Sequence, residues 1–102
     1  MGFAVRFTPQ AREDLARLYD WLLQRAESDL TVVERVPQAI RDGVTVLALA
    51  PLSCRKAVPA DPFLRELVIG FGASGYVLLF EAESDQVVTV LTVRHQREDD
   101  YH

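Results

Sequence analysis

The sequence predicts an α+β domain with the order strand, helix, helix, strand, strand, strand. Three observations predict this fold. A short run near the start alternates apolar and polar residues, two longer segments carry apolar stripes at helical spacing, and three strand-like runs on short turns close the chain. A length of 102 residues suits a single core, so we expect one domain over residues 1–102.

The first strand and helix are the clearest elements. Residues 3–8, FAVRFT, alternate as a strand with one buried face does. Thr8 suits the N-cap of a helix over about 9–26, and Pro9 suits its first position. The predicted apolar stripe of this helix is Ala11, Leu15, Leu18, Leu22 and Ala26, widened by Tyr19 and Leu23. The charged residues expected off the stripe are Glu13, Asp14, Arg17, Asp20 and Arg25.

A second helix is predicted over about 30–50, with Ser28-Asp29 offering its N-cap. Its apolar stripe is Val33, Val36, Ile40, Val44 and Leu47. Pro37 and Gly43 lie inside it, and the proline is expected to kink or divide the helix. The two helices, joined by a short turn, should form an antiparallel hairpin.

The last part of the chain predicts an antiparallel meander. Three of the five prolines fall in residues 51–63, which are therefore expected to form a loop. Strand-like runs follow at 64–71, 76–82 and 86–93, joined by short turns at GASG and around Ser84-Asp85. The strand at 3–8 can join this sheet as a fourth, and the helical hairpin can cover one face of it.

Composition excludes several classes of protein. The net charge of −4 disfavours binding through phosphate neutralisation, so we expect no sequence-specific nucleic-acid binding. One cysteine, Cys54, excludes an internal disulfide, and we expect it to be a small, half-buried residue. His95 and His102 do not form a metal-ligand pattern, and no phosphate-binding loop is present, so we expect neither metal nor cofactor. Without a membrane span or signal peptide, a cytoplasmic protein is expected.

The chain's densest mix of charge, imidazole and phenol follows its last strand. Arg94, His95, Arg97 and Tyr101 lie there, and Arg65 comes early on the first meander strand. His95 could serve as a general acid or base near neutral pH. In the alternative interpretation the arginines pair with acidic neighbours or with Glu66 on the surface, His95 is an ordinary strand-end histidine, and Tyr101 packs back on the sheet. A serine triad is possible on composition alone, but Ser53, Ser74 and Ser84 are better explained as turn residues.

Several of these segments together resemble one known family. The segments VRFTPQAREDLARLYDWL, LRELVI at 64–69, GYVLLF at 75–80 and VLTVRHQRE..Y at 90–101 resemble the RelE/ParE superfamily of bacterial toxin–antitoxin toxins. The resemblance covers nearly the whole chain, with the element order given above.

The resemblance implies one of two activities. RelE-type members cut messenger RNA on the ribosome with basic residues on the sheet and a C-terminal tyrosine. The matching positions here hold Val68, Gly70, Val77 and Gln96 (or Arg97, if the alignment shifts by one), and of the set only Tyr101 is kept. RNA cleavage needs a proton acceptor, a proton donor and cations, which these residues do not supply. The chain is thus more similar to the ParE branch, whose members are understood to poison DNA gyrase by binding.

The resemblance also implies partners. We expect a cognate antitoxin, with a helix that lies in an apolar groove, and DNA gyrase as the target. Tyr19, Trp21 and Leu23 are candidates for the groove, although all three could belong to the core. For partner binding we expect Arg65, Arg94, His95, Arg97 and Tyr101, since interface hot spots favour Arg and Tyr. There are two rival hypotheses. One is a divergent ribonuclease in which the same five residues, from Arg65 to Tyr101, surround one anion pocket. The other is an inactive homologue that only binds antitoxin.

Overall fold

The computed structural model describes residues 2–25, 30–71 and 74–95, with side chains described outside 21–36 and 71–74. In chain order the elements are β1 (Ala4–Phe7), α1 (Pro9–Arg25), α2 (Leu30–Leu49), the short 3-10 helix η1 (Pro51–Ser53), β2 (Arg55–Val58), β3 (Asp61–Phe71), β4 (Ser74–Ala82) and β5 (Val87–His95). The predicted α+β class is confirmed. The expected N-cap at Ser28-Asp29 lies outside the described residues.

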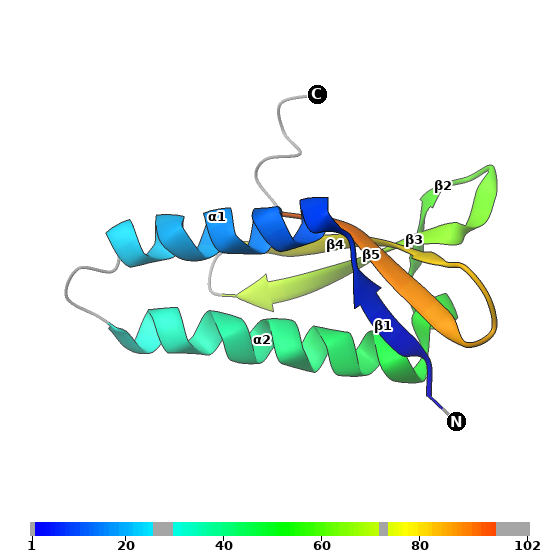
Figure 1. The fold of residues 1–102 in the computed structure, drawn as a ribbon, viewed down its shortest axis with the longest axis horizontal. Coiled ribbons are helices and arrows are strands. Elements are labelled where there is room, and N and C mark those ends of the chain that lie inside the picture. Colours follow the sequence, from blue (N-terminus) through cyan, green and yellow to red (C-terminus); the bar gives the residue numbers. More distant parts are fainter. Residues whose placement is uncertain (1, 26–29, 72–73, 96–102) are drawn as a thin grey trace.

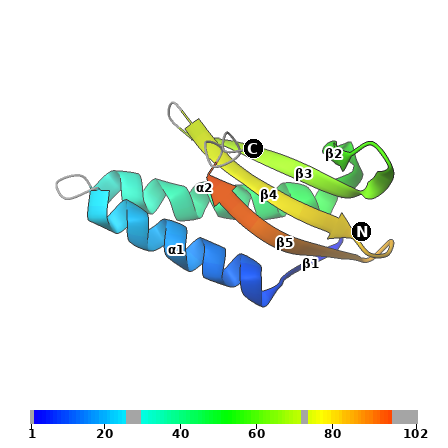
Figure 2. The same cartoon turned by 90° about the horizontal axis from the view of Figure 1, so that it is seen from above.

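The strands form one sheet in the order β1-β5-β4-β3-β2 (Figures 1 and 2). The first strand runs parallel to β5, and the other neighbours are antiparallel. The turn between β4 and β5 is held by Ser84, whose hydroxyl accepts the backbone N–H groups of Gln86 and Val87, both at 3.1 Å. A turn role for this serine is therefore confirmed.

The expectation of a loop over 51–63 was wrong. This segment holds η1, β2 and the start of β3, so the sheet has five strands instead of four. Arg55 pairs with Glu66 and Lys56 with Arg65, which makes the short run RKAV an edge strand. The prolines do not prevent it because they lie outside β2: Pro51 begins η1, Pro59 follows β2, and Pro62 is near the start of β3. Tertiary pairing here outweighs the local turn signal.

The second helix is not divided at Pro37, since α2 is one helix from Leu30 to Leu49. A proline inside a helix costs about 3 kcal/mol, which burial of the apolar stripe can offset. Gly43 has a packing reason: a Cβ there would lie 2.6 Å from Ile69 Cδ1 and 3.3 Å from Leu67 Cδ2. The glycine therefore allows α2 to approach β3 closely.

The core lies between the two helices and one face of the sheet. Its buried residues are Ala11, Leu18, Leu47, Tyr76, Leu78, Phe80, Val88, Val90 and Val93. Figures 1 and 2 show α1 and α2 side by side along the sheet. Because side chains alternate along a strand, the residues between these core positions point to the opposite face, which the helices leave uncovered. Within the described ranges, neither helix is long and apolar enough to cross a membrane.

Two side chains of the first helix and its cap hold β5 where β1 stops. Thr8 caps α1 as predicted, accepting the N–H of Ala11 at 3.1 Å, and its hydroxyl donates to the Leu91 carbonyl at 2.8 Å. Asp14 accepts the N–H of Val93 at 3.0 Å. This aspartate is only 6% exposed, so its expected place off the buried stripe was wrong. The pairing of β1 with β5 ends at Val90, so β1 offers no backbone acceptor to Val93. The Asp14 carboxylate takes the place of that acceptor.

Candidate functional site

The uncovered face of the sheet, here called the open face, is one candidate surface. Its central described residues are Leu64, Glu66, Val68, Gly70, Val77, Leu79, Glu81, Thr92 and Arg94. Val68 and Val77 are directly opposite each other on β3 and β4, and Arg94 lies opposite Val77 on β5. The centre of this face is thus mainly apolar.

The open face carries an ion-pair network centred on Glu66. One carboxylate oxygen accepts from Arg94 at 3.0 Å, and the other accepts from Arg55 at 3.2 Å. The Arg94 side chain is 23% exposed, whereas that of Arg55 is 60% exposed, so the first pair is the better shielded from water. The predicted alternative, in which Arg94 pairs with Glu66, is confirmed. The charge that a phosphate would require of Arg94 is already balanced by this carboxylate.

Arg65 lies elsewhere. It pairs with Phe80 on β4, and alternation gives it the opposite face from Glu66. Its Nε donates to the Pro62 carbonyl and its Nη1 to the Cys54 carbonyl, both at 2.7 Å. The guanidinium thus ties Cys54, the residue just before β2, to the start of β3, and the structure does not bring it together with Arg94.

His95 also separates from Arg94, because adjacent residues of a strand point to opposite faces. The imidazole meets the ring of Tyr76 edge-on, with centroids 5.5 Å apart and an interplanar angle of 87°. It therefore lies on the helix side of the sheet. Two other predicted members of this set, Arg97 and Tyr101, lie outside the described residues.

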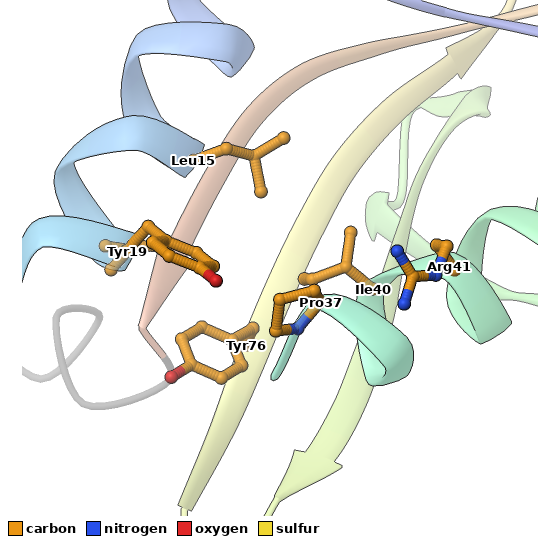
Figure 3. Close-up of a pocket in the computed structure, with 7 residues that line it drawn as sticks. Leu15, Tyr19, Pro37, Ile40, Arg41 and Tyr76 are labelled. Atoms are coloured by element: carbon orange, nitrogen blue, oxygen red, sulfur yellow. The ribbon is translucent and has the colours of Figure 1, made fainter. Parts of the chain in front are cut away.

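A second candidate surface is an apolar groove between the helices, here called the helix groove. It has a volume of about 260 Å³ and is lined by Leu15, Leu18 and Tyr19 of α1, Pro37, Ile40 and Arg41 of α2, and Tyr76 of β4. In Figure 3, Tyr19 of α1 lies on one side of the groove, Pro37 and Ile40 of α2 lie on the other, and Tyr76 of β4 lies between them. Tyr19 is 39% exposed, which fits a groove wall better than the core. The side chains of Trp21 and Leu23 lie outside the described set.

Two described side chains, Tyr76 and Cys54, have raised pKa values. Burial raises the pKa of the Tyr76 hydroxyl. Burial also raises the pKa of the half-buried Cys54 thiol, with Arg65 as a weaker opposing influence. A raised pKa keeps cysteine in its unreactive thiol form at neutral pH. Among the described residues, no group of three or more His, Cys, Asp or Glu side chains could hold a metal ion.

The sequence did not identify Glu66 as the centre of a network or Pro37 as a groove residue. Glu66 was considered only as a surface partner of the arginines, because the β2–β3 pairing that brings Arg55 to it was not predicted. The sequence did contain an indication for Pro37, because it lies three residues before Ile40, which belongs to the predicted apolar stripe, and residues at this spacing share one side of a helix.

Comparison with known proteins gives consistent results. Residues 5–100 match the family model described as the ParE toxin of the type II toxin–antitoxin system parDE. The chain is 38% identical over 96 residues to a protein named toxin RelE3 from Caulobacter vibrioides, covering 93% of this chain and 96% of that protein. It also resembles a chain of the chromosomal ParDE toxin–antitoxin system from P. aeruginosa, with a TM-score of 0.68 and 19% identity, covering 91% of this chain and 95% of that one. The last likeness bears on the fold alone.

Proposed function

Since this chain belongs to the ParE toxin family of type II toxin–antitoxin systems, we propose that it inhibits bacterial DNA gyrase by binding, without enzymatic chemistry. Membership of the family implies an antitoxin partner. Gyrase as the target and binding as the mode of action are the parts that we add.

The apolar centre of the open face carries this proposal. The positions where the resemblance to ribonuclease members implies basic residues hold Val68, Gly70 and Val77, and two of them are paired across β3 and β4. Hydrocarbon side chains can neither take up a proton nor stabilise a phosphorane. Arg94, beside them, is paired with Glu66. Val77 is only 1% exposed, so the accessible apolar part of this face is made by the half-buried Leu64, Val68 and Leu79. A surface of this kind favours contact with a protein over chemistry on RNA.

We place the antitoxin in the helix groove. An amphipathic helix can insert apolar side chains between Tyr19 and Ile40, where the groove is open and its floor is the buried ring of Tyr76. Tyrosine at such a wall offers a large contact area at low conformational cost. The aspartate variant Tyr19→Asp should weaken rescue of growth by the antitoxin of the same locus, because it places a charge in the apolar contact. Val46→Asp, at a residue of α2 that is 41% exposed and does not line the groove, is the matched control.

The target is tested by inducing the chain in bacteria and following pulses of labelled thymidine and methionine. Inhibition of gyrase should stop thymidine incorporation first and induce a DNA-damage reporter, while methionine incorporation continues. An early loss of methionine incorporation with cut messenger RNA would contradict the proposal. Normal growth at full expression would instead indicate a homologue that only binds antitoxin.

Ribosome-dependent cleavage of messenger RNA is the second candidate, favoured by the name of the Caulobacter relative, toxin RelE3. It would need Arg65, Arg94, His95, Arg97 and Tyr101 around one anion, of which Arg97 and Tyr101 lie outside the described residues. In the described part of the chain, Arg65 is bonded to two carbonyls, and adjacent positions give Arg94 and His95 opposite faces of the sheet. The labelling experiment separates the two candidates.

A further inference from the structure

A second apolar cleft lies beyond the C-terminal end of α2, at the end of the sheet where the β4–β5 turn lies. It has a volume of about 400 Å³ and is formed where β1 begins, where η1 follows α2, and where the β4–β5 turn meets the start of β3. We call it the hairpin cleft. Its apolar lining is Phe3, Leu52, Phe63 and Ala82, and its polar lining is Glu83, Ser84 and Asp85.

The cleft exists because the sheet extends past its helical cover. Phe63 alternates with Leu67 and Ile69 on the face of β3 that α2 covers. The helix ends at Leu49, so the strand continues without a helix above it. Phe63 is consequently 53% exposed and Leu52 is 48% exposed. Large apolar side chains that share a concave surface are typical of interaction sites.

The rim of the cleft is acidic and ordered. Ser84 holds the turn through the N–H groups of Gln86 and Val87, and the N–H of Glu83 donates to the Val87 carbonyl at 3.0 Å. Glu83 and Asp85 are therefore carried by a fixed turn beside the apolar lining. Among the described residues that line the cleft, none is basic. The helix groove, by contrast, has Arg41 in its lining and no acidic residue among its described lining residues.

We propose that the hairpin cleft binds an extended protein segment in which one bulky apolar side chain stands between arginines or lysines. The apolar side chain packs against Phe63 and Leu52, and the flanking cations pair with Glu83 and Asp85. Complementary charge at a rim selects partners and excludes those of like charge. This site is separate from the helix groove, and the proposal does not depend on gyrase as the target.

The test uses short synthetic peptides and the isotopically labelled, folded chain. Acetyl-Arg-Phe-Arg-amide should shift the backbone NMR signals of Phe3, Phe63 and Ser84, with an affinity in the millimolar range. Acetyl-Glu-Phe-Glu-amide should bind at least about tenfold more weakly, because its carboxylates face an acidic rim. The double variant Glu83→Gln, Asp85→Asn should remove this preference and leave the spectrum otherwise native.

The apolar part of the proposal is tested with Phe63→Ser, which should abolish the shifts caused by the basic peptide. Val46→Ser, at an exposed residue of α2 outside both clefts, should leave them unchanged. Absence of shifts at this cleft, equal binding of the two peptides, or shifts confined to the helix groove would overturn the proposal. Sedimentation that depends on protein concentration without peptide, and that Phe63→Ser abolishes, would assign the cleft to a second copy of the chain and also overturn it.

Discussion

Replacing Asp14 with alanine should destabilise the protein far more than other changes in the charged residues of α1. Its carboxylate is buried and accepts the N–H of Val93 at 3.0 Å and the Gln10 amide at 2.9 Å, with Arg17 at 3.6 Å. A hydrogen bond to a charged group contributes about 1.5–3 kcal/mol, and a buried donor left without its partner costs a similar amount. We therefore expect Asp14→Ala to lower the free energy of unfolding by about 2–3 kcal/mol. For a domain of this size, that corresponds to a fall in Tm of about 10–20 °C.

Urea and thermal unfolding, followed by circular dichroism, measure this effect. The neighbouring variant Glu13→Ala is the control, since Glu13 is exposed and its loss should change stability by less than about 0.5 kcal/mol. Asp14→Asn keeps one acceptor oxygen and should fall between the two. If Asp14→Ala is no more destabilising than Glu13→Ala, then Asp14 does not hold α1 to β5, and the argument for this contact fails.

Three further predictions concern the network, the helix contact and the buried tyrosine. In double-mutant cycles by urea unfolding, the coupling energy between Glu66 and Arg94 should exceed that between Glu66 and Arg55. The Glu66–Arg55 coupling should be no more than about 0.5 kcal/mol because the Arg55 side chain is exposed. Equal coupling energies would contradict this prediction. Gly43→Val should cost about 1–3 kcal/mol of unfolding free energy by overpacking α2 against β3, and an unchanged urea midpoint would show that the contact is loose. Burial raises the pKa of the Tyr76 hydroxyl above its ordinary 10.0, so folding favours the protonated, neutral tyrosine. The resulting contribution to the free energy of unfolding is complete below about pH 10 and is lost as the pH rises through the raised pKa. Wild-type stability should thus fall more steeply above pH 10 than that of Tyr76→Phe in urea titrations, and parallel slopes would refute the assigned cause.

Local patterns predicted most of the fold. The Thr8 cap, both helices and the three meander strands follow from spacing and turn chemistry, which act over a few residues. The strand β2 was missed because its stability comes from pairing with β3, and three prolines around it gave a stronger loop signal. Its bounds could not be read from propensity alone.

The candidate surfaces were less predictable because they depend on register. The sequence could not tell that Glu66 and Arg94 share a face while Arg65 does not, since a shift of one residue reverses every side chain. For Asp14 a signal existed: it lies three residues after Ala11 and four before Leu18, on the buried side of the helix. A charged residue at such a position indicates a buried hydrogen bond, which here is to β5.

The proposed inhibition of gyrase by binding can be measured with purified components. The folded chain is added to DNA gyrase and plasmid with and without ATP, and supercoiling and trapped DNA cleavage are read on one gel. We expect loss of supercoiling with accumulation of cleaved DNA, and both effects should disappear when the antitoxin is added first. Full gyrase activity at a large molar excess of folded toxin, together with cleavage of ribosome-bound messenger RNA by the same preparation, would contradict it.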